Sequence, residues 1–373
     1  MNHRIPVLLD GDPGHDDAIA WMLAATGLDI RGVSSAAGNQ TIEKTTRNAL
    51  RICTLLGIRA PVAMGLARPL LSEALTAPSV HGVSGLDGPA LPEPDREAAH
   101  ERAPEQMARL LRESAEPLTI VATAPLTNVA ALLLAHPELK ANIAGISLMG
   151  GGLAHGNWTP AAEFNILADP EAADVVFRSG LPITMAGLDV TEQALLYPED
   201  FARIRAAGNP VAETVAGWLD FFFAFHRTKG YAGAPVHDAV AVCALLRPDL
   251  LHFEDWHVTV ETQGAFCRGA TAGDRRTAPT AHRQPGLEIV GLSTVAGNVT
   301  LDHTTENTLK ICGLMGADYP VYPGAPGPLR REREDASSFH GADGLGGAVL
   351  PAPRRAPEQT PAWDALYAAA KRM

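Results

Sequence analysis

The amino-acid sequence predicts an α/β fold, with a mainly parallel central sheet that is flanked by helices. Short apolar runs alternate with longer helical patterns at the spacing that is typical of strand–helix–strand units. Polar residues gather directly after several of the apolar runs. Parallel sheets bind ligands beyond the carboxyl ends of their strands, so we expect the functional site at that edge of the sheet.

The expected elements follow one another through the first half of the chain. The run "IPVLLD" is continuously apolar and ends at a Pro-Gly turn, as expected of a buried parallel strand. The helix after it covers residues 16–26, with "AIAWMLAA" on its apolar face. A second strand and loop have the sequence "DIRGVSSAAGN", a second helix is expected over residues 41–56, and "APVAMG" is a third strand. Further strands are expected at residues 118–123, 143–152 and 181–187.

Composition limits the class of protein. The 373 residues are 46% hydrophobic and 19% charged, which is ordinary for a globular chain with a large core. The 30 basic and 42 acidic residues give a formal net charge of −12, so a nucleic-acid partner is not expected. The cysteines lie far apart without paired spacing, which argues against a zinc site or a disulfide framework. No stretch has the length of a membrane span and no signal segment precedes the first strand, so we expect a cytoplasmic protein without a membrane partner.

Asp10, Asp12, Asp16 and Asp17 fall within the short segment "DGDPGHDD". Like charges this close repel one another, so a folded protein needs a reason to hold them together. A single aspartate at the start of a helix is typical of a cap, but a cap does not explain Asp10 and Asp12 at the end of a strand. A hard divalent cation does explain them, because Ca²⁺ takes about six to eight oxygen ligands. Mg²⁺ also prefers oxygen ligands, so the residue types alone leave it open.

Other polar residues follow later strand ends or start helices. Each of them alone is typical of a turn or a helix cap. They are Thr123 after an apolar strand, Asn157, Glu163 and Asn165 in "MGGGLAHGNWTPAAEFN", and His237 and Asp238 in "VHDAVAV".

Together these segments resemble the inosine–uridine preferring nucleoside hydrolases, from about Val7 to about Arg276. "DGDPGHDD" is similar to the family's DxDxxxDD signature, and "AEFN" and "VHD" are similar to its later site segments. The resemblance implies hydrolysis of the N-glycosidic bond of a ribonucleoside to free base and ribose, in nucleoside salvage or catabolism. The family is commonly oligomeric, so a homo-oligomer is implied, although the sequence fixes neither the oligomeric state nor a purine or pyrimidine preference.

The resemblance also implies roles for single residues. One calcium ion, with magnesium the less favoured alternative, would be held by Asp10, Asp17, Asp238 and the backbone carbonyl of Thr123. Asp12 would be the general base that takes a proton from the attacking water, and His237 the proton donor to the leaving base. The implied substrate-binding residues are Asp16, Asn39, Asn157, Glu163 and Asn165 at the ribose hydroxyls, Met149 beneath the sugar, His81 on a mobile flap, and Tyr231 on a loop over the base.

Two alternative functions stay open at this point. A magnesium-dependent phosphohydrolase would use Asp10 as nucleophile and Asp12 as acid, but Gly14 stands where its usual DxDxT pattern has threonine. A catalytically silent nucleoside- or sugar-binding protein would not need a general base, so the complete acidic set argues against it.

The roles of two aromatic segments also stay open. Trp158 could stack on a base or simply be buried, and "FFFAF" before Tyr231 is interpreted as a buried helix face.

The end of the chain repeats an earlier part of it. The segment that begins at Gly27 recurs from Gly286, and the offset of 286 − 27 = 259 holds without a gap to Pro92 and Pro351. We therefore divide the chain into a catalytic domain at 1–276, a linker at 277–285, and a partial repeat of residues 27–92 with a C-terminal extension at 286–373. The second copy has no counterpart of "DGDPGHDD", so it is not expected to form an active site.

The resemblance sets an expectation for this tail. The family ends with one more strand and a helix that the first domain lacks. We expect "LEIVGLST" and a helix over residues 301–315 to fill those places, because an apolar strand needs cover. The Pro-, Gly- and Arg-rich remainder is expected to be loose, with a short helix in "TPAWDALYAAAKRM".

Overall fold

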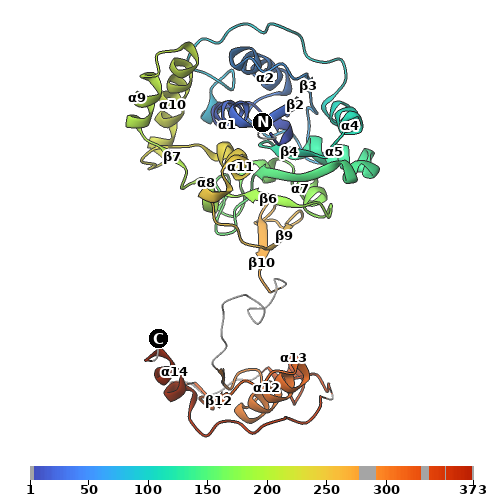
Figure 1. The fold of residues 1–373 in the computed structure, drawn as a ribbon, viewed down its shortest axis with the longest axis vertical. Helices are drawn as coiled ribbons and strands as arrows, with labels where there is room; N and C mark the ends of the chain where they lie inside the picture. The colour runs from blue at the N-terminus through green and yellow to red at the C-terminus, as the bar shows by residue number, and fades with distance from the viewer. Residues whose placement is uncertain (1–3, 277–290, 329–335, 349, 372–373) are drawn as a thin grey trace. The chain divides into compact units, whose positions relative to one another are not determined.

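The computed structural model describes residues 4–276, 291–328, 336–348 and 350–371. The chain forms two compact units, Met1–Ala278 and Pro279–Met373, and each is described by itself (Figure 1). The predicted linker at 277–285 lies outside the described residues. Among the helices that the structure describes, none combines the length and the apolar character needed to cross a bilayer.

A six-stranded sheet in the order β3-β2-β1-β4-β5-β6 forms the centre of the first unit. All of its neighbouring strands pair in parallel, so the predicted fold class is confirmed. The strands are β1 (Pro6–Gly11), β2 (Asp29–Ser35), β3 (Val62–Met64), β4 (Leu118–Ala122), β5 (Ile143–Met149) and β6 (Ile183–Ala186). β1 lies in the middle of the sheet with every residue buried, which is why its sequence is apolar on both faces until Asp10.

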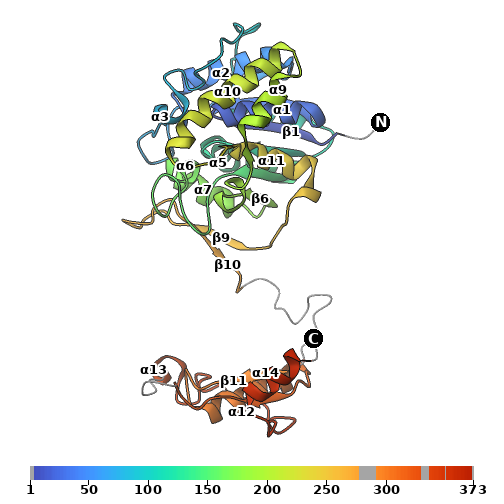
Figure 2. The same cartoon turned by 90° about the vertical axis from the view of Figure 1, so that its left-hand side faces the viewer.

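Helices cover both faces of this sheet (Figure 2). Val7 and Leu9 of β1 point into one core, with residues of α1, α2, α10 and α11, whereas Leu8 points into the other, with residues of α4, α5 and α7. The helices on the first face are α1 (His15–Gly27), α2 (Ile42–Leu56), α10 (Pro210–Thr228) and α11 (His237–Leu246). Those on the second face are α4 (Ala103–Glu113), α5 (Thr127–Ala135) and α7 (Pro170–Phe177).

Shorter elements connect these layers. The helical ones are α3 (Pro78–His81), η1 (Pro137–Asn142), α6 (Phe164–Ala168), α8 (Leu188–Thr191), α9 (Pro198–Arg205) and η2 (Pro248–Leu250). The strands β7 (Leu195–Leu196) and β8 (Ala234–Pro235) form one antiparallel pair, and β9 (His257–Val260) and β10 (Thr271–Asp274) form another. Because β1, β4 and β5 are parallel neighbours, the loops after them open at the same edge of the sheet.

The second unit repeats the first element by element. Its elements are β11 (Leu292–Thr294), α12 (Leu301–Met315), β12 (Val321–Pro323), α13 (Ser337–His340) and α14 (Ala362–Ala370). Subtracting 259 from their first residues gives 33, 42, 62, 78 and 103, which lie in or begin β2, α2, β3, α3 and α4. Pairing also repeats, since Leu292 is opposite Val321 as Val33 is opposite Val62. The repeat therefore extends beyond residue 351, where the sequence similarity stops being visible, to the last helix.

The prediction for the tail was wrong in one respect. Strand β11 pairs with β12 in a two-stranded sheet of its own and does not join the six-stranded sheet. The reason is local: the tail carries its own β3-like strand, which offers a parallel edge about twenty-five residues away. The helix over residues 301–315 and the short C-terminal helix are confirmed.

Candidate active site

The acidic segment lies where the central strand turns into the first helix. Asp10 is the last residue but one of β1, and Asp12 follows in the turn before α1. Asp16 and Asp17 occupy the first turn of α1, where the helix dipole favours negative charge. The backbone N–H of Gly14 donates to Asp17 Oδ2 at 3.0 Å, which closes the turn. All four aspartates are buried.

Three carboxylates from two helices meet beside this turn. Asp16, Asp17 and Asp238 offer oxygen atoms that all lie within 4.8 Å of one another, and they form the one such group among the described residues. Extensive packing of α1 against α11 brings Asp238 to the others across more than two hundred residues of chain. Thr123, at the end of β4, joins them because its hydroxyl donates to Asp17 Oδ1 at 2.7 Å.

Asp10, which was predicted as a ligand, lies outside this group of three. Its Oδ1 accepts a hydrogen bond from Asn128 Nδ2 at 2.8 Å, so the side chain is oriented by helix α5. Sequence reasoning placed Asp10 with Asp17 and Asp238, whereas the structure places Asp16 with them.

The electrostatics of the buried carboxylates fit a divalent cation. Burial raises the pKa of Asp10 to about 7, of Asp16 to about 8 and of Asp17 to about 6, and repulsion by the Asp17 carboxylate adds to the effect at Asp10 and Asp16. The pKa values of Asp12 and Asp238 are raised for the same two reasons. Moreover, Asp10 Oδ2, Asp12 Oδ1 and Asp16 Oδ1 are buried and accept no hydrogen bond from the described residues. A cation would offset both the repulsion and the missing partners.

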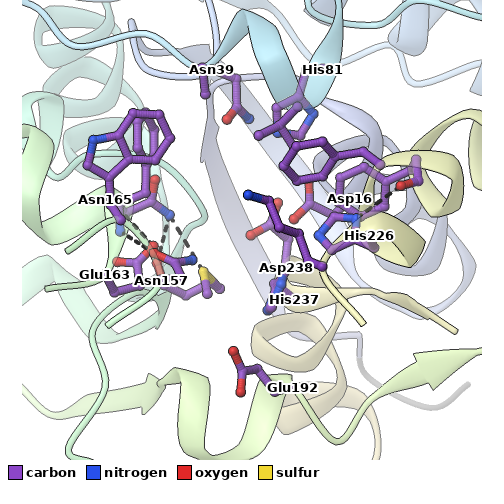
Figure 3. A pocket seen from close by; sticks show the side chains of 18 of the residues that line it. Asp16, Asn39, His81, Asn157, Glu163, Asn165, Glu192, His226, His237 and Asp238 are labelled. Atoms are coloured by element: carbon purple, nitrogen blue, oxygen red, sulfur yellow. Dashed lines mark hydrogen bonds between the residues drawn. The ribbon is translucent and has the colours of Figure 1, made fainter. Parts of the chain in front are cut away.

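A cavity of about 770 Å³ opens above these carboxylates. Most of the predicted site residues line it, whereas Asp10, Asp12 and Asp17 do not. The predicted residues in the lining are Asp16, Asn39, His81, Thr123, Met149, Asn157, Glu163, Asn165, Tyr231, His237 and Asp238. In Figure 3, Asn157, Glu163 and Asn165 face Asp16, His237 and Asp238 across the cavity.

The wall that carries Glu163 is held by backbone donors. Glu163 caps α6, and its carboxylate accepts the N–H groups of Gly151, Asn165 and Ile166 at 2.9–3.1 Å. Asn165 Nδ2 donates to the carbonyl oxygens of Thr123 and Met149, both at 3.2 Å, and so links the ends of β4 and β5. These hydrogen bonds fix the side chains of Glu163 and Asn165 in orientations that leave them facing the cavity for a ligand.

His237 begins α11 directly beside Asp238. Its Nδ1 lies 2.8 Å from Thr191 Oγ1 at the end of α8, which leaves Nε2 as the free ring nitrogen. Burial lowers the pKa of His237 to about 3, and nearby His226 adds to the effect, so the imidazole is neutral at pH 7. A neutral ring held at Nδ1 can present a proton or a lone pair at Nε2.

Several residues of the cavity were missed by sequence reasoning. His226 and Lys229, close to Tyr231 in the chain, line the cavity, and so do His155 and Glu192 at its edge. Glu192 accepts hydrogen bonds from the Tyr231 hydroxyl at 2.7 Å and, at 3.0 Å, from His155 Nε2. The one available signal was that His226 begins the same predicted loop as Tyr231.

The interpretation of "FFFAF" needs a correction. Phe222 is buried as expected, yet Phe222 and Phe225 both line the cavity. Phe222 and Phe225 are three positions apart and therefore lie on the same face of α10. This face borders the cavity as well as the core. Trp158 also lines the cavity, is 40% exposed, and meets Phe164 edge to face with ring centroids 4.9 Å apart.

Comparison with known proteins agrees with this site. The family model described as inosine-uridine preferring nucleoside hydrolase matches residues 7–283 and, a second time, residues 277–373. The chain therefore belongs to the inosine–uridine preferring nucleoside hydrolase family, and it is a nucleoside hydrolase. The pyrimidine-specific ribonucleoside hydrolase RihA of Escherichia coli (strain K12) is 55% identical over 275 residues, which cover 72% of this chain and 88% of that protein.

Solved structures agree as well. A purine-preferring ribonucleoside hydrolase from Gardnerella vaginalis has a TM-score of 0.70 at 34% identity, covering 74% of this chain and 90% of that chain. A plant nucleoside hydrolase has a TM-score of 0.69 at 29% identity, with the same coverage of 74% and 90%. These coverages are those expected if the first unit alone corresponds to a whole nucleoside hydrolase.

Proposed function

We propose that the first unit hydrolyses pyrimidine ribonucleosides to free base and ribose, with a calcium ion and with Asp12 as general base. The observation that carries this proposal is the cluster of buried carboxylates beside a cavity that Asp16 and Asp238 line. Asp10, Asp12 and Asp16 each have an oxygen without a partner among the described residues. A silent binding protein does not need a general base, and the family relationship disfavours both this alternative and a phosphohydrolase.

The cation would be held by Asp17, Asp238 and the backbone carbonyl of Thr123, with Asp10 as a further predicted ligand. Carboxylate and carbonyl oxygens on several separate segments suit Ca²⁺, which accepts irregular coordination, better than Mg²⁺, which demands near-octahedral geometry. When bound, such a cation lowers the pKa of water and orients it for attack.

Asp12 is suited to take the proton from the attacking water. Its Oδ2 accepts the backbone N–H of Asn39 at 2.6 Å, which fixes the side chain, while Oδ1 has no partner among the described residues. Burial and the neighbouring Asp17 carboxylate raise the pKa of Asp12 well above its ordinary value. A general base works best when its pKa is close to the operating pH, so the raised value favours this role.

The ribose would lie between the two walls of the cavity. Asp16 has an unpartnered Oδ1 that can accept a ribose hydroxyl, and Asn39 and Asn165 supply amide groups. Glu163 brings negative charge to the same space, which favours the positive charge that develops on the ring as the glycosidic bond breaks. In its protonated form, His237 would give its Nε2 proton to the departing base, because a base leaves poorly as an anion.

The pyrimidine preference is the finer part of the proposal. It rests on similarity, since the 55% identical relative is named pyrimidine-specific whereas the 34% identical structure is named purine-preferring. A panel of uridine, cytidine, inosine and adenosine tests it by the release of free ribose. We expect kcat/KM for uridine and cytidine to exceed that for the purines by at least about tenfold. Equal or greater purine hydrolysis would refute the preference and leave the hydrolase activity intact.

The role of His237 is tested with two substrates. We expect His237→Ala to lower kcat for uridine by about 10²–10³-fold, because general acid catalysis supplies factors of this size. Nitrophenyl riboside has a leaving group that departs without protonation, so the same variant should hydrolyse it at a rate within about threefold of the unchanged protein. An equal loss with both substrates would show that His237 is not the leaving-group acid.

A further inference from the structure

We propose that Glu192 is a positioning residue that holds Tyr231, and with it the loop 229–233, in one place beside the active-site cavity. Glu192 directly follows α8, the loop follows α10, and both Glu192 and Tyr231 line the cavity. No catalytic step proposed above uses Glu192. The inference rests on the proposed function, because it takes Tyr231 as a contact of the base in the bound nucleoside.

The Glu192 carboxylate joins two separate segments at the edge of the cavity. The hydroxyl of Tyr231 donates to Oε1 at 2.7 Å, and Nε2 of His155, in the loop after β5, donates to Oε2 at 3.0 Å. A carboxylate oxygen accepts hydrogen bonds, so both partners are donors. Each oxygen therefore has a donor of its own, and the side chain cannot turn away without breaking both hydrogen bonds.

The backbone that carries Glu192 is held independently of the loop. Directly before it, Oγ1 of the buried Thr191 lies 2.8 Å from Nδ1 of His237. Two residues after it, the carbonyl oxygen of Ala194 accepts the N–H of Val236 at 2.9 Å, and β7 then pairs with β8. A side chain on a supported backbone can impose a position on a loop, whereas one on a loose backbone could only follow it.

The rest of the loop offers little to hold it in place. Gly230 has a φ of +89°, and a Cβ built there would meet no atom within 4 Å, so the loop has open space beside it. The Tyr231 ring meets His226 edge to face, with ring centroids 5.4 Å apart. Among the described residues, the bond from Tyr231 to Glu192 is the one side-chain hydrogen bond that this loop makes. Removing it would leave the loop with ring packing and backbone contacts alone.

The same contact decides what Tyr231 offers to a ligand. A tyrosine hydroxyl has one proton to donate and two lone pairs. Because the proton is directed at Glu192, the phenolic oxygen has only lone pairs left for a ligand, so it accepts an N–H of the base. Burial, with Glu192 adding to the effect, raises the pKa of Tyr231, which keeps this proton on the hydroxyl at neutral pH.

Two substitutions separate the hydrogen bond from the bulk of the side chain. Glu192→Ala removes both acceptors, whereas Glu192→Gln keeps a carbonyl oxygen that can accept the Tyr231 hydroxyl. We expect Glu192→Ala to raise KM for uridine about tenfold, the scale of a hydrogen bond to a charged group, and to leave kcat within about twofold. Glu192→Gln should keep KM within about threefold of that of the unchanged protein.

Tyr231→Phe tests whether Glu192 acts through the tyrosine. In this background Glu192→Ala should change KM less than about twofold, because the hydroxyl that Glu192 holds is gone. Gln193→Ala is the matched control and should leave KM unchanged, since Gln193 Nε2 donates to the backbone oxygen of Asp189 and its side chain lines a separate cavity. Equal rises of KM in both backgrounds, a fall of kcat without a rise of KM, or no rescue by glutamine would overturn the proposal.

The hold on the loop can also be measured without any reaction. Trypsin cleaves after lysine, and the exposed Lys229 stands two residues before Tyr231. In limited proteolysis of the full chain, with the cut site identified by mass spectrometry, we expect cleavage after Lys229 to be at least about fivefold faster in Glu192→Ala and in Tyr231→Phe. The unchanged protein and Gln193→Ala should be cleaved there at the same slow rate. Equal cleavage in all four proteins would overturn the proposal, and this failure is distinct from a failure of the proposed function because no nucleoside is used.

Discussion

The properties of the acidic residues come from their burial as much as from their identity. The sequence pattern was enough to predict a cation site from the four clustered aspartates. It could not show that Asp16 joins Asp17 and Asp238 while Asp10 bonds Asn128, because an aspartate at the strand end and one at the helix start are equally suitable ligands until the neighbouring helices are placed. Glu192 was overlooked for a similar reason, since its partners lie thirty-seven and thirty-nine residues away.

The first prediction concerns the general base. Asp12→Asn preserves the size of the side chain but removes its ability to take a proton. We expect kcat to fall by about 10²–10⁴-fold. The loss should be similar for uridine and for nitrophenyl riboside, since both are attacked by the same water. This common loss contrasts with the selective loss expected for His237→Ala. A variant that keeps more than about a tenth of the activity toward either substrate would contradict the assignment.

The second prediction concerns pH and metal removal. Without a cation, Asp10 and Asp16 have folded-state pKa values of about 7 and about 8, above the ordinary value of 3.8. At a pH between the ordinary pKa of aspartate and the raised pKa of each of these two residues, the folded chain binds a proton that the unfolded chain does not. The free energy of unfolding therefore falls as pH rises through this range. The lowered pKa values of His15 and His237 act in the opposite sense, but only below about pH 6.5.

We therefore expect the chelated protein to lose about 2–3 kcal/mol of stability from pH 6.5 to pH 8.5. Thermal unfolding in the presence of a chelator measures this loss. Saturating Ca²⁺ should reduce the loss, because the cation replaces the protons, and Asp16→Asn should reduce it without calcium. A chelated protein that is equally stable or more stable at pH 8.5 would contradict these pKa shifts.

At the scale of elements, the strands and helices of the first unit could be predicted because each is marked by a continuous apolar run or a helical period. The prediction was weaker where an element has two roles. Helix α10 supplies Phe222 to both the core and the cavity and Phe225 to the cavity, and a sequence pattern does not distinguish these environments. The flap over residues 78–88, which carries His81, was visible as a glycine-rich loop, but its contacts with α1 and α10 depend on tertiary packing.

The third prediction concerns the contact between α10 and Pro89, which directly follows the glycine-rich flap that carries His81. A Cβ at Gly217 would overlap the ring of Pro89. Glycine to alanine in the interior of a helix ordinarily stabilises by about 0.5–1 kcal/mol. We expect Gly217→Ala to destabilise instead, by about 1–3 kcal/mol, because the overlap displaces the flap. Differential scanning calorimetry measures the change.

Gly313→Ala is the matched control. Gly313 lies inside α12, and a Cβ there would meet Arg354 Cγ at an ordinary 3.5 Å. This variant should show the usual stabilisation in the transition of the second unit. If Gly217→Ala stabilises the first unit as Gly313→Ala stabilises the second, then the contact between α10 and the flap is not as tight as described.

At the scale of the whole molecule, the second unit copies elements of a nucleoside hydrolase without the elements that cover them. Leu366 is 62% exposed, whereas Met107, its counterpart at an offset of 259, is 1% exposed. Ile311 is 40% exposed, and its counterpart Ile52 is fully buried. In the first unit these residues pack with β1, α1 and β4, which have no counterpart in the second. The sequence repeat predicted this incompleteness, but not that β11 would pair within the second unit.

The fourth prediction follows from that pairing. Because the strand and helix of the repeat do not complete the six-stranded sheet, a truncated chain of residues 1–278 should keep kcat and KM for uridine within about twofold. Purified truncated protein compared with the full chain in the ribose assay measures this. Loss of folding or of activity on truncation would show that the second unit is required by the first.

The central claim is that the buried carboxylates hold a divalent cation needed for nucleoside hydrolysis. The most direct test is ribose release from uridine by metal-depleted full-length protein, with Ca²⁺ added back while bound calcium is counted. The account predicts that activity is lost on depletion, that Ca²⁺ restores it, and that restoration is complete at one calcium ion per chain, since the second unit lacks the acidic segment. Undiminished ribose release by protein shown to be free of divalent metal would contradict it.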